Sequence, residues 1–186
     1  MIFRSFQLNV NESNAFVLAC DETREALLVD VGALAPEIED FLSDNQLSLV
    51  KIFITHDHFD HTGGLAQAVG RYGAEVLCGK TGMAGHGTRP VAHGDEVRIG
   101  TLAGKVLATP GHTPDSISLV FPGLAFTGDA LFAGSVGGTT SPARAGEQID
   151  AIREHILSLP DDYEIHPGHG PASTVGIERA HNPFLV

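Results

Sequence analysis

The residues best suited to chemistry lie together in the segment from Thr55 to His61, which reads THDHFDH. If the chain stays extended, His56, His58 and Asp60 project to one side with a period of two, and a turn at Asp60 lets His61 join them. Imidazole and carboxylate groups are ligands that suit zinc, iron or manganese. The segment therefore predicts a metal site, and the competing interpretation is a solvated loop rich in histidine and acid.

Three more residues of the same types follow apolar runs later in the chain. His112 comes after Thr-Pro-Gly, Asp129 after Phe-Thr-Gly, and His169 after His-Pro-Gly. Each residue taken alone is typical of turn chemistry or of a surface position. Together with the first segment, they supply the remaining ligands of a two-metal site at the ends of several strands.

Short strands must position these residues. Apolar and β-branched runs separated by polar breaks predict an opening antiparallel meander over Ile2–Leu8, Ala15–Cys20 and Ala26–Val31. A nearly continuous apolar strand, Leu49–Thr55, then runs directly into His56. The further runs predict six more strands: Glu75–Cys78, Glu96–Ile99, Gly104–Thr109, Ser116–Phe121, Leu124–Thr127 and Tyr163–His166.

Helical spacing of apolar residues predicts three helices between these strands: Pro36 to Asn45, Leu65 to Arg71 and Gln148 to Leu159. Two segments rich in glycine are expected to be irregular, namely Gly79–Gly94 and Gly134–Pro142. The alternation predicts mixed α and β layers, although periodicity alone leaves the topology open.

Composition restricts the class of protein. A chain of 186 residues predicts a single domain over residues 1–186, and 11 basic against 23 acidic residues give a net charge of -12, the wrong sign for nucleic acid or anionic lipid. With no apolar segment long enough for a membrane span or a signal peptide, we expect a cytoplasmic protein without a membrane partner. Cys20 and Cys78 lie in apolar stretches, which predicts buried free thiols.

The pattern His-Xaa-His-Xaa-Asp-His with a later His, Asp and His resembles the metallo-β-lactamase superfamily. That resemblance implies an α/β fold, the αββα sandwich, in which helices flank two mixed β-sheets and the metals lie at one edge of the sheets. It also implies two divalent metal ions, zinc before iron or manganese, that share Asp129 as a bridging ligand. The remaining ligands would be His56, His58 and His112 for the first ion, and Asp60, His61 and His169 for the second.

Three phrases narrow the resemblance to the short, single-domain relatives of glyoxalase II: Gly-His-Thr-Pro at 111–114, Gly-Asp-Ala-Leu-Phe at 128–132 and His-Pro-Gly-His-Gly-Pro at 166–171. Iron flavoprotein relatives carry glutamate in place of His58, and true β-lactamases commonly carry cysteine in place of Asp129, so both are disfavoured. The basic and aromatic thiol-binding positions of glyoxalase II correspond here to residues 138–140, Gly-Thr-Thr, and Asp115 replaces the usual glycine. We therefore expect weak recognition of glutathione.

The resemblance implies a hydrolase of small-molecule thioesters or related esters, with a metal-bridging hydroxide as nucleophile. Asp129 as the bridge and Asp60, which would orient the hydroxide, are the candidate catalytic residues. The alternatives are a mononuclear iron persulfide dioxygenase with His56, His112 and Asp129 as ligands, a lactone or other ester hydrolase, and a metal-binding protein without turnover. Three residues are candidates to orient the imidazoles: Asp57, Thr62 and His166.

Overall fold

The apolar runs of the first half of the chain form one mixed sheet. The computed structural model describes residues 1–186. The strands of this sheet lie in chain order: β1 (Ile2–Gln7), β2 (Asn14–Ala19), β3 (Glu25–Val29), β4 (Ser48–Phe53), β5 (Glu75–Cys78) and β6 (Arg89–Pro90). The pairs from β1 to β3 are antiparallel and those from β3 to β6 are parallel. Because β3 and β4 run in parallel, the chain leaves both at the same edge of the sheet.

The second half forms another mixed sheet, in the order β14-β13-β10-β9-β8-β7. Its strands are β7 (Glu96–Ile99), β8 (Leu102–Ala108), β9 (Ile117–Phe121), β10 (Leu124–Gly128), β13 (Glu164–Pro167) and β14 (Ser173–Thr174). Only β10 and β13 pair in parallel. A separate small hairpin joins β11 (Leu131–Phe132) to β12 (Ser135–Val136).

Alternation along β2 shows how one strand serves two cores. Ala15, Val17 and Ala19 point to the core between the first sheet and its helices. Phe16 and Leu18 point to the core between the two sheets. Since successive side chains alternate across a strand, an apolar run buried on both faces is the sequence signature of this central layer.

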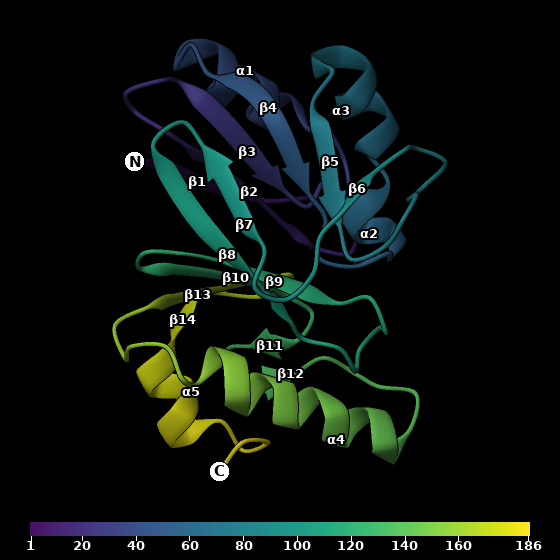
Figure 1. The fold of residues 1–186 in the computed structure, drawn as a ribbon, viewed down its shortest axis with the longest axis vertical. Coiled ribbons are helices and arrows are strands. Elements are labelled where there is room, and N and C mark those ends of the chain that lie inside the picture. The colour runs from purple at the N-terminus through teal and green to yellow at the C-terminus, as the bar shows by residue number, and fades with distance from the viewer.

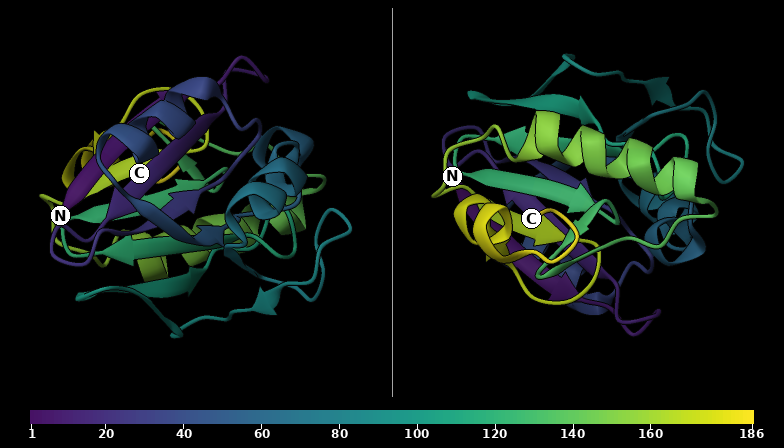
Figure 2. Two further views of the ribbon diagram at one scale, coloured as in Figure 1. Left: turned by 90° about the horizontal axis from the view of Figure 1, so that it is seen from above. Right: turned by 90° about the horizontal axis from the view of Figure 1, so that it is seen from below.

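Helices cover the outer face of each sheet (Figure 1). On the first sheet lie α1 (Pro36–Asp44) and α3 (Leu65–Tyr72), and on the second lie α4 (Pro142–Ala151), its π-helical continuation η1 (Ile152–Ile156), and α5 (Val175–His181). Figure 2 shows α4 and α5 side by side on the second sheet. A one-turn helix, α2 (Phe59–Thr62), follows β4. The expected α/β fold, an αββα sandwich of two mixed sheets flanked by helices, is therefore confirmed.

Several boundaries differ from those predicted. The helix expected to start at Gln148 starts at Pro142, because Ser141 caps it by accepting a hydrogen bond from the Arg144 N–H and proline fits the first helical position. The irregular segment before it also contains β12, and α5 was not expected at all. Cys20 and Cys78 are buried and unpaired, as predicted. None of the helices combines the length and apolarity needed to cross a membrane.

Candidate metal centre

The predicted ligands all reach one edge of the sandwich. The first sheet contributes four of them from the connection after β4: His56, His58, Asp60 and His61. The second sheet contributes three from the connections after β8, β10 and β13: His112, Asp129 and His169. The edge where the two sheets meet therefore gathers residues that are more than 100 positions apart in the chain.

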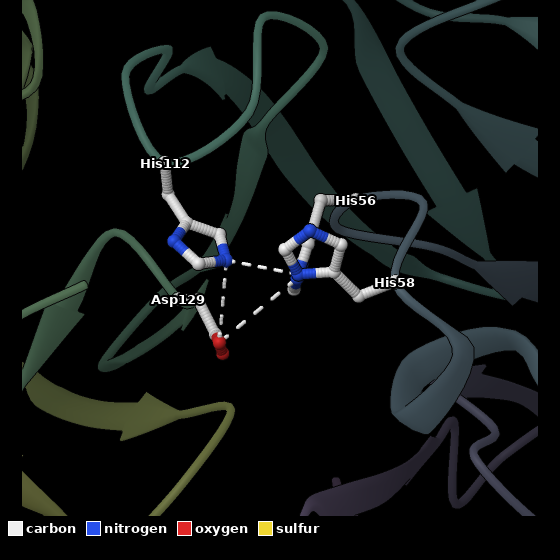
Figure 3. Close-up of side chains that lie close together, drawn as sticks. All are labelled: His56, His58, His112 and Asp129. Carbon is white, nitrogen blue, oxygen red and sulfur yellow. Dashed lines mark hydrogen bonds and ion pairs between the residues drawn. The ribbon is translucent and has the colours of Figure 1, made fainter. Parts of the chain in front are cut away.

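Four side chains form a first cluster (Figure 3). The Nδ1 atom of His58 lies 3.0 Å from the Nε2 atom of His56 and 3.0 Å from the Nε2 atom of His112. The Oδ2 atom of Asp129 lies 3.9 Å from Nε2 of His56 and 3.6 Å from Nε2 of His112. Three imidazoles and one carboxylate thus converge on a single point.

Three side chains form a second cluster, and Asp129 adjoins it as well. The Oδ2 atom of Asp60 lies 3.3 Å from Nε2 of His169 and 4.0 Å from Nε2 of His61. Asp129 turns Oδ1 toward Nε2 of His61, at 3.4 Å, and Oδ2 toward Nε2 of His169, at 3.6 Å. One carboxylate therefore lies between the two clusters.

The spacing and the hydrogen bonding of these atoms fit divalent cations. A tetrahedral zinc ion with bonds of about 2.0–2.1 Å to nitrogen holds its ligand atoms about 3.3–3.4 Å apart, close to the separations in both clusters. Nε2 of His61 and Oδ1 of Asp129 are also buried without a hydrogen-bond partner. Because a buried polar atom left unpaired is costly, these two atoms call for a ligand that binds both.

The imidazoles are oriented by their other nitrogen. Nδ1–H of His112 donates to the carbonyl oxygen of Gly138 at 2.6 Å, and Nδ1–H of His61 donates to Oδ2 of Asp30 at 2.8 Å. Each bond fixes the ring and leaves Nε2 facing its cluster, which is how proteins prepare a histidine for a metal.

Asp30 is the functional residue that sequence reasoning missed. It follows β3 and is almost fully buried. Besides His61, it accepts hydrogen bonds from the backbone N–H and the hydroxyl of Thr55, each at 2.8 Å. Since the hydroxyl proton is used on Asp30, the Thr55 oxygen accepts from Nδ1–H of His56 at 3.1 Å. A signal was present, because a single acidic residue interrupts the apolar run from Leu27 to Val31.

The two clusters differ in charge. Burial, together with the neighbouring His61, lowers the pKa of His56 to about 2. Burial and the nearby His112 also lower the pKa of His58. Burial opposes protonation of His61 too, but the carboxylates of Asp30 and Asp129 outweigh it and raise the pKa of His61 to about 10.

The ion pair between His61 and Asp129 also affects the carboxyl group of Asp129. Its burial favours the neutral acid, yet the adjacent protonated ring of His61 outweighs that effect and lowers the pKa of Asp129. In the absence of metal, His56 and His58 of the first cluster are therefore neutral, whereas the second cluster holds a protonated His61 beside a carboxylate.

Comparison with known families agrees with this geometry. The family model described as the metallo-beta-lactamase superfamily matches residues 8–169. The chain belongs to this superfamily. The matched range includes every residue of both clusters.

Relatives within the metallo-β-lactamase superfamily resemble the chain over most of its length. It is 30% identical to the hydroxyacylglutathione hydrolase GloC of Haemophilus influenzae, covering 90% of this chain and 91% of that one. The structure of ETHE1 from Myxococcus xanthus is 34% identical, with a TM-score of 0.86 over 98% of this chain and 84% of that one. TTHA1623, solved in a di-iron-bound form, is 28% identical, with a TM-score of 0.84 over 98% of this chain and 100% of that one. The chain spans about half the length of other hydroxyacylglutathione hydrolases that it matches.

One detail of this metallo-β-lactamase superfamily site differs from the sequence prediction. The expected turn at Asp60 begins one residue earlier, because α2 starts at Phe59 and the His61 N–H donates to the carbonyl of His58. Asp60 consequently leaves the alternating series of His56 and His58 and joins His61 in the second cluster. The one-turn helix is what divides the segment between two sites.

The three residues expected to orient the imidazoles form their hydrogen bonds and ion pairs elsewhere than on the ligand rings. Asp57 pairs with Lys80, the Thr62 hydroxyl donates to the backbone carbonyl of His58, and His166 pairs with Glu164. Lys80 also lies 3.4 Å from Asp115. The unusual charge of Asp115 is therefore balanced, and Lys80 links the loops that carry His58 and His112.

The turn between β1 and β2 supports the second cluster of this superfamily site. The Ser13 hydroxyl donates to the backbone carbonyl of Asp60 at 2.8 Å, and the Asn11 amide donates to Oδ2 of Asp60 at 3.3 Å. The Asn14 amide donates to the carbonyls of Pro167 and Gly170, beside His169, at 2.9 Å each. This turn therefore holds two of the connections that carry candidate ligands.

Proposed function

We propose that the protein is a hydrolase that cleaves thioesters or related small esters with the help of two divalent cations, zinc in first place. His56, His58 and His112 would hold one cation, Asp60, His61 and His169 would hold the other, and Asp129 would contact both. The observation that carries this proposal is the position of Asp129. Its Oδ2 lies 3.6 Å from Nε2 of His112 in the first cluster and 3.6 Å from Nε2 of His169 in the second, and its Oδ1 lies 3.4 Å from Nε2 of His61. A carboxylate in that position fits a pair of cations better than one.

The cations would supply Lewis acidity, which lowers the pKa of a bound water toward neutrality and polarises a carbonyl. The chain's own part is to hold the reactants. Oδ2 of Asp60 is engaged by Asn11 and lies beside His169, whereas Oδ1 makes no hydrogen bond and is available to accept a proton from the attacking water. As the water oxygen bonds to the carbonyl carbon and the carbon–sulfur bond breaks, that proton passes to the departing thiolate.

Two similarities support this assignment. The name of the Haemophilus influenzae relative describes hydrolysis of a thioester of glutathione, and TTHA1623 binds two irons. Glutathione itself is not part of the proposal, because Gly138, Thr139 and Thr140 offer no basic or aromatic side chain to a charged thiol. We therefore propose a less charged thiol or alcohol as the leaving group.

A mononuclear iron dioxygenase acting on a persulfide is the second candidate. One observation favours it: His56, His112 and Asp129 converge in the first cluster, and two histidines with one carboxylate are a ligand set of iron oxygenases. His169 distinguishes the two reactions, since it belongs to the second cluster alone.

The test is His169→Ala. In the hydrolase, loss of this imidazole should reduce bound metal from about two equivalents to about one, and the turnover number for a small thioester should fall by roughly a hundredfold or more, since about 1.4 kcal/mol is a factor of ten. In the dioxygenase, iron content and persulfide-dependent oxygen uptake should survive. Metal analysis, thioester hydrolysis and oxygen uptake are measured on the same preparations.

His181→Ala is the matched control, because His181 is exposed at the end of α5 and lies outside both clusters. It should behave as the wild type in all three assays. Oxygen uptake with a persulfide, one iron per chain and indifference to His169→Ala would together exclude the hydrolase. Metal retention without turnover of any thioester, ester or lactone would indicate a metal-binding protein.

A further inference from the structure

Lys80 lies where three connections of the sandwich meet. Its ammonium donates a hydrogen bond to Oδ2 of Asp57 and lies 3.4 Å from Oδ2 of Asp115. Asp57 precedes His58 on the connection after β4 of the first sheet. Asp115 follows His112 by three residues, on the connection after β8 of the second sheet. One ammonium therefore contacts both connections that carry the imidazoles of the first cluster.

The backbone of Lys80 is fixed in place for these contacts. Its carbonyl oxygen accepts hydrogen bonds from the Cys78 thiol, at 3.0 Å, and from the Thr88 hydroxyl, at 2.8 Å. A Cβ atom on Gly79 would lie 2.4 Å from the backbone oxygen of Asp115, so only glycine lets the two segments approach this closely. The lysine side chain therefore starts from a fixed point beside Asp115.

Lys80 also balances the charge of Asp115. The side chain of Asp115 is 16% exposed, and its Oδ2 atom is buried and accepts no hydrogen bond. Removing the cation of such a pair costs more than at an exposed pair, because a buried carboxylate is left uncompensated. Burial opposes protonation of Lys80, but the carboxylates of Asp57 and Asp115 outweigh it and raise the pKa of the ammonium. The ammonium therefore remains charged and attracts both carboxylates.

The same two connections are joined at their base by the backbone. The Ile117 N–H donates to the carbonyl oxygen of Thr55 at 3.0 Å. Farther out, the rings of His58 and His112 face each other from the two connections, with Nδ1 of one 3.0 Å from Nε2 of the other (Figure 3). Both rings lie on loops, so their separation depends on what holds the loops together above the base. Lys80 supplies a contact at that level.

We propose that Lys80 is a positioning residue of the metal centre, which draws its two carboxylate partners together and so keeps His58 and His112 at ligand spacing. The inference rests on the proposed function only in taking a divalent cation as the occupant of the first cluster. A purely electrostatic role would have the opposite effect, because the positive charge of Lys80 repels a cation. Removal of Lys80 should weaken metal binding if the residue positions the rings, and strengthen it if the charge alone matters.

The first experiment is Lys80→Gln, with zinc titrated into the metal-free protein against a chelator. Zinc affinity at the first cluster should fall about tenfold, the size of effect seen when a group that supports metal ligands is lost. Lys80→Arg keeps a charged donor for both carboxylates and should retain most of the affinity. Lys105→Gln removes the same charge from an exposed position of β8 outside both clusters, and it should titrate as the wild type does. Unchanged or tighter binding in Lys80→Gln would overturn the proposal.

A double-mutant cycle separates positioning from charge. Asp115→Asn removes one side of the link and should weaken zinc binding at the first cluster about as much as Lys80→Gln. The double variant should bind no more weakly than either single variant, because both changes break the same link. With charge alone, the two changes would cancel in the double variant, and that result would contradict the proposal. Unchanged binding in Asp115→Asn would do the same, even if Lys80→Gln failed to fold.

Two further measurements distinguish the inference from the proposed function. In the metal-free protein, the nuclear Overhauser effect between the rings of His58 and His112 should weaken in Lys80→Gln, and an unchanged effect would contradict the proposal. Hydrolysis of a small thioester by Lys80→Gln should be reduced at limiting zinc and recovered at excess zinc, because only the occupancy of the site has changed. A loss that excess zinc does not recover would mean that Lys80 acts otherwise than through ligand spacing. If the wild type hydrolyses no thioester while Lys80→Gln still shows the weaker zinc binding, the proposed function is refuted and the positioning role stands.

Discussion

The two clusters of the candidate metal centre are prepared in different ways. In the first, neutral groups support the rings of His56 and His112, namely the Thr55 hydroxyl and the Gly138 carbonyl. The second is built around His61, whose buried ring lies between the carboxylates of Asp30 and Asp129. The contrast appears in the pKa values of two adjacent buried imidazoles, about 2 for His56 and about 10 for His61. The neighbouring carboxylates therefore orient the ring of His61 and also keep it protonated.

The difference has a thermodynamic consequence for metal binding. A cation can bind His56 without displacing a proton, because that ring is neutral at physiological pH. At the second cluster, a cation must displace the proton of His61, since a pKa of about 10 keeps the ring protonated. The two sites should therefore respond differently to pH, to removal of Asp30 and to loss of the Asn11 contact.

The largest expected effect is that of pH. Below a pKa of about 10, each unit increase in pH should strengthen metal binding at the second cluster about tenfold, because fewer protons compete. The lowered pKa values of His56 and His58 remove that competition from those two rings of the first cluster above about pH 6.5. Zinc titrations against a chelator between about pH 6.5 and 8.5 should resolve two affinities. Over this range the affinity of the second cluster should rise about a hundredfold more than that of the first. Parallel slopes for both sites would contradict the contrast.

The next effect is that of Asp30→Asn. Asparagine tolerates the positive φ of 54° at this position, but its Nδ2 group donates where Asp30 accepts. Nδ1 of His61 would then become the acceptor, which moves the proton to Nε2, the atom that faces the second cluster. Zinc affinity at that cluster should fall about 10-fold to 100-fold, with a smaller change at the first. Zinc-binding isotherms fitted with two sites measure the affinities of both clusters.

Asp44→Asn is the control for this variant, since Asp44 is exposed at the end of α1. It should leave both affinities unchanged. Equal weakening of both clusters by Asp30→Asn would show that Asp30 acts on His56 through Thr55 as strongly as it acts directly on His61.

The smallest effect is expected from Asn11→Gly. The amide of Asn11 contributes one exposed hydrogen bond to Oδ2 of Asp60, and its loss should weaken metal binding at the second cluster by roughly twofold to fivefold. Glu12→Gly is the matched control, because Glu12 has a similar positive φ, 54° against 49°, and glycine adopts both values freely. Only Asn11→Gly should alter the metal titration. A change of the same size in Glu12→Gly would assign the effect to the backbone of the turn.

Much of the site could be predicted because its chemistry is local in sequence. The segment from His56 to His61 combines four candidate ligands within six positions, and the apolar strand that runs into it is easily recognised. The supporting residues were harder to predict, because their partners are distant in sequence. Asp30 bonds to Thr55, 25 positions away, and Asn11 bonds to Asp60, 49 positions away. Such contacts depend on which strands become neighbours, which residue spacing does not encode.

Two helices show the same limit. The start of α4 was missed because Ser141-Pro142 lies at the end of a glycine-rich stretch that reads as a loop, although serine and proline are typical of a helix start. The short α5 has only Val175 and Glu178 buried, so its apolar periodicity is too weak to detect. Both helices take much of their stability from packing against the second sheet rather than from local propensity.

The division of the ligands between two sheets also matters for folding. Four candidate ligands belong to the first sheet and three to the second, so a pair of bound cations would crosslink the sandwich at one edge. A ligand that binds the folded chain alone stabilises it by about 2.7 kcal/mol when its concentration is a hundred times its dissociation constant. Metal supply would then raise the stability of the folded protein, and chelation would loosen the sandwich first at the edge that carries the candidate ligands.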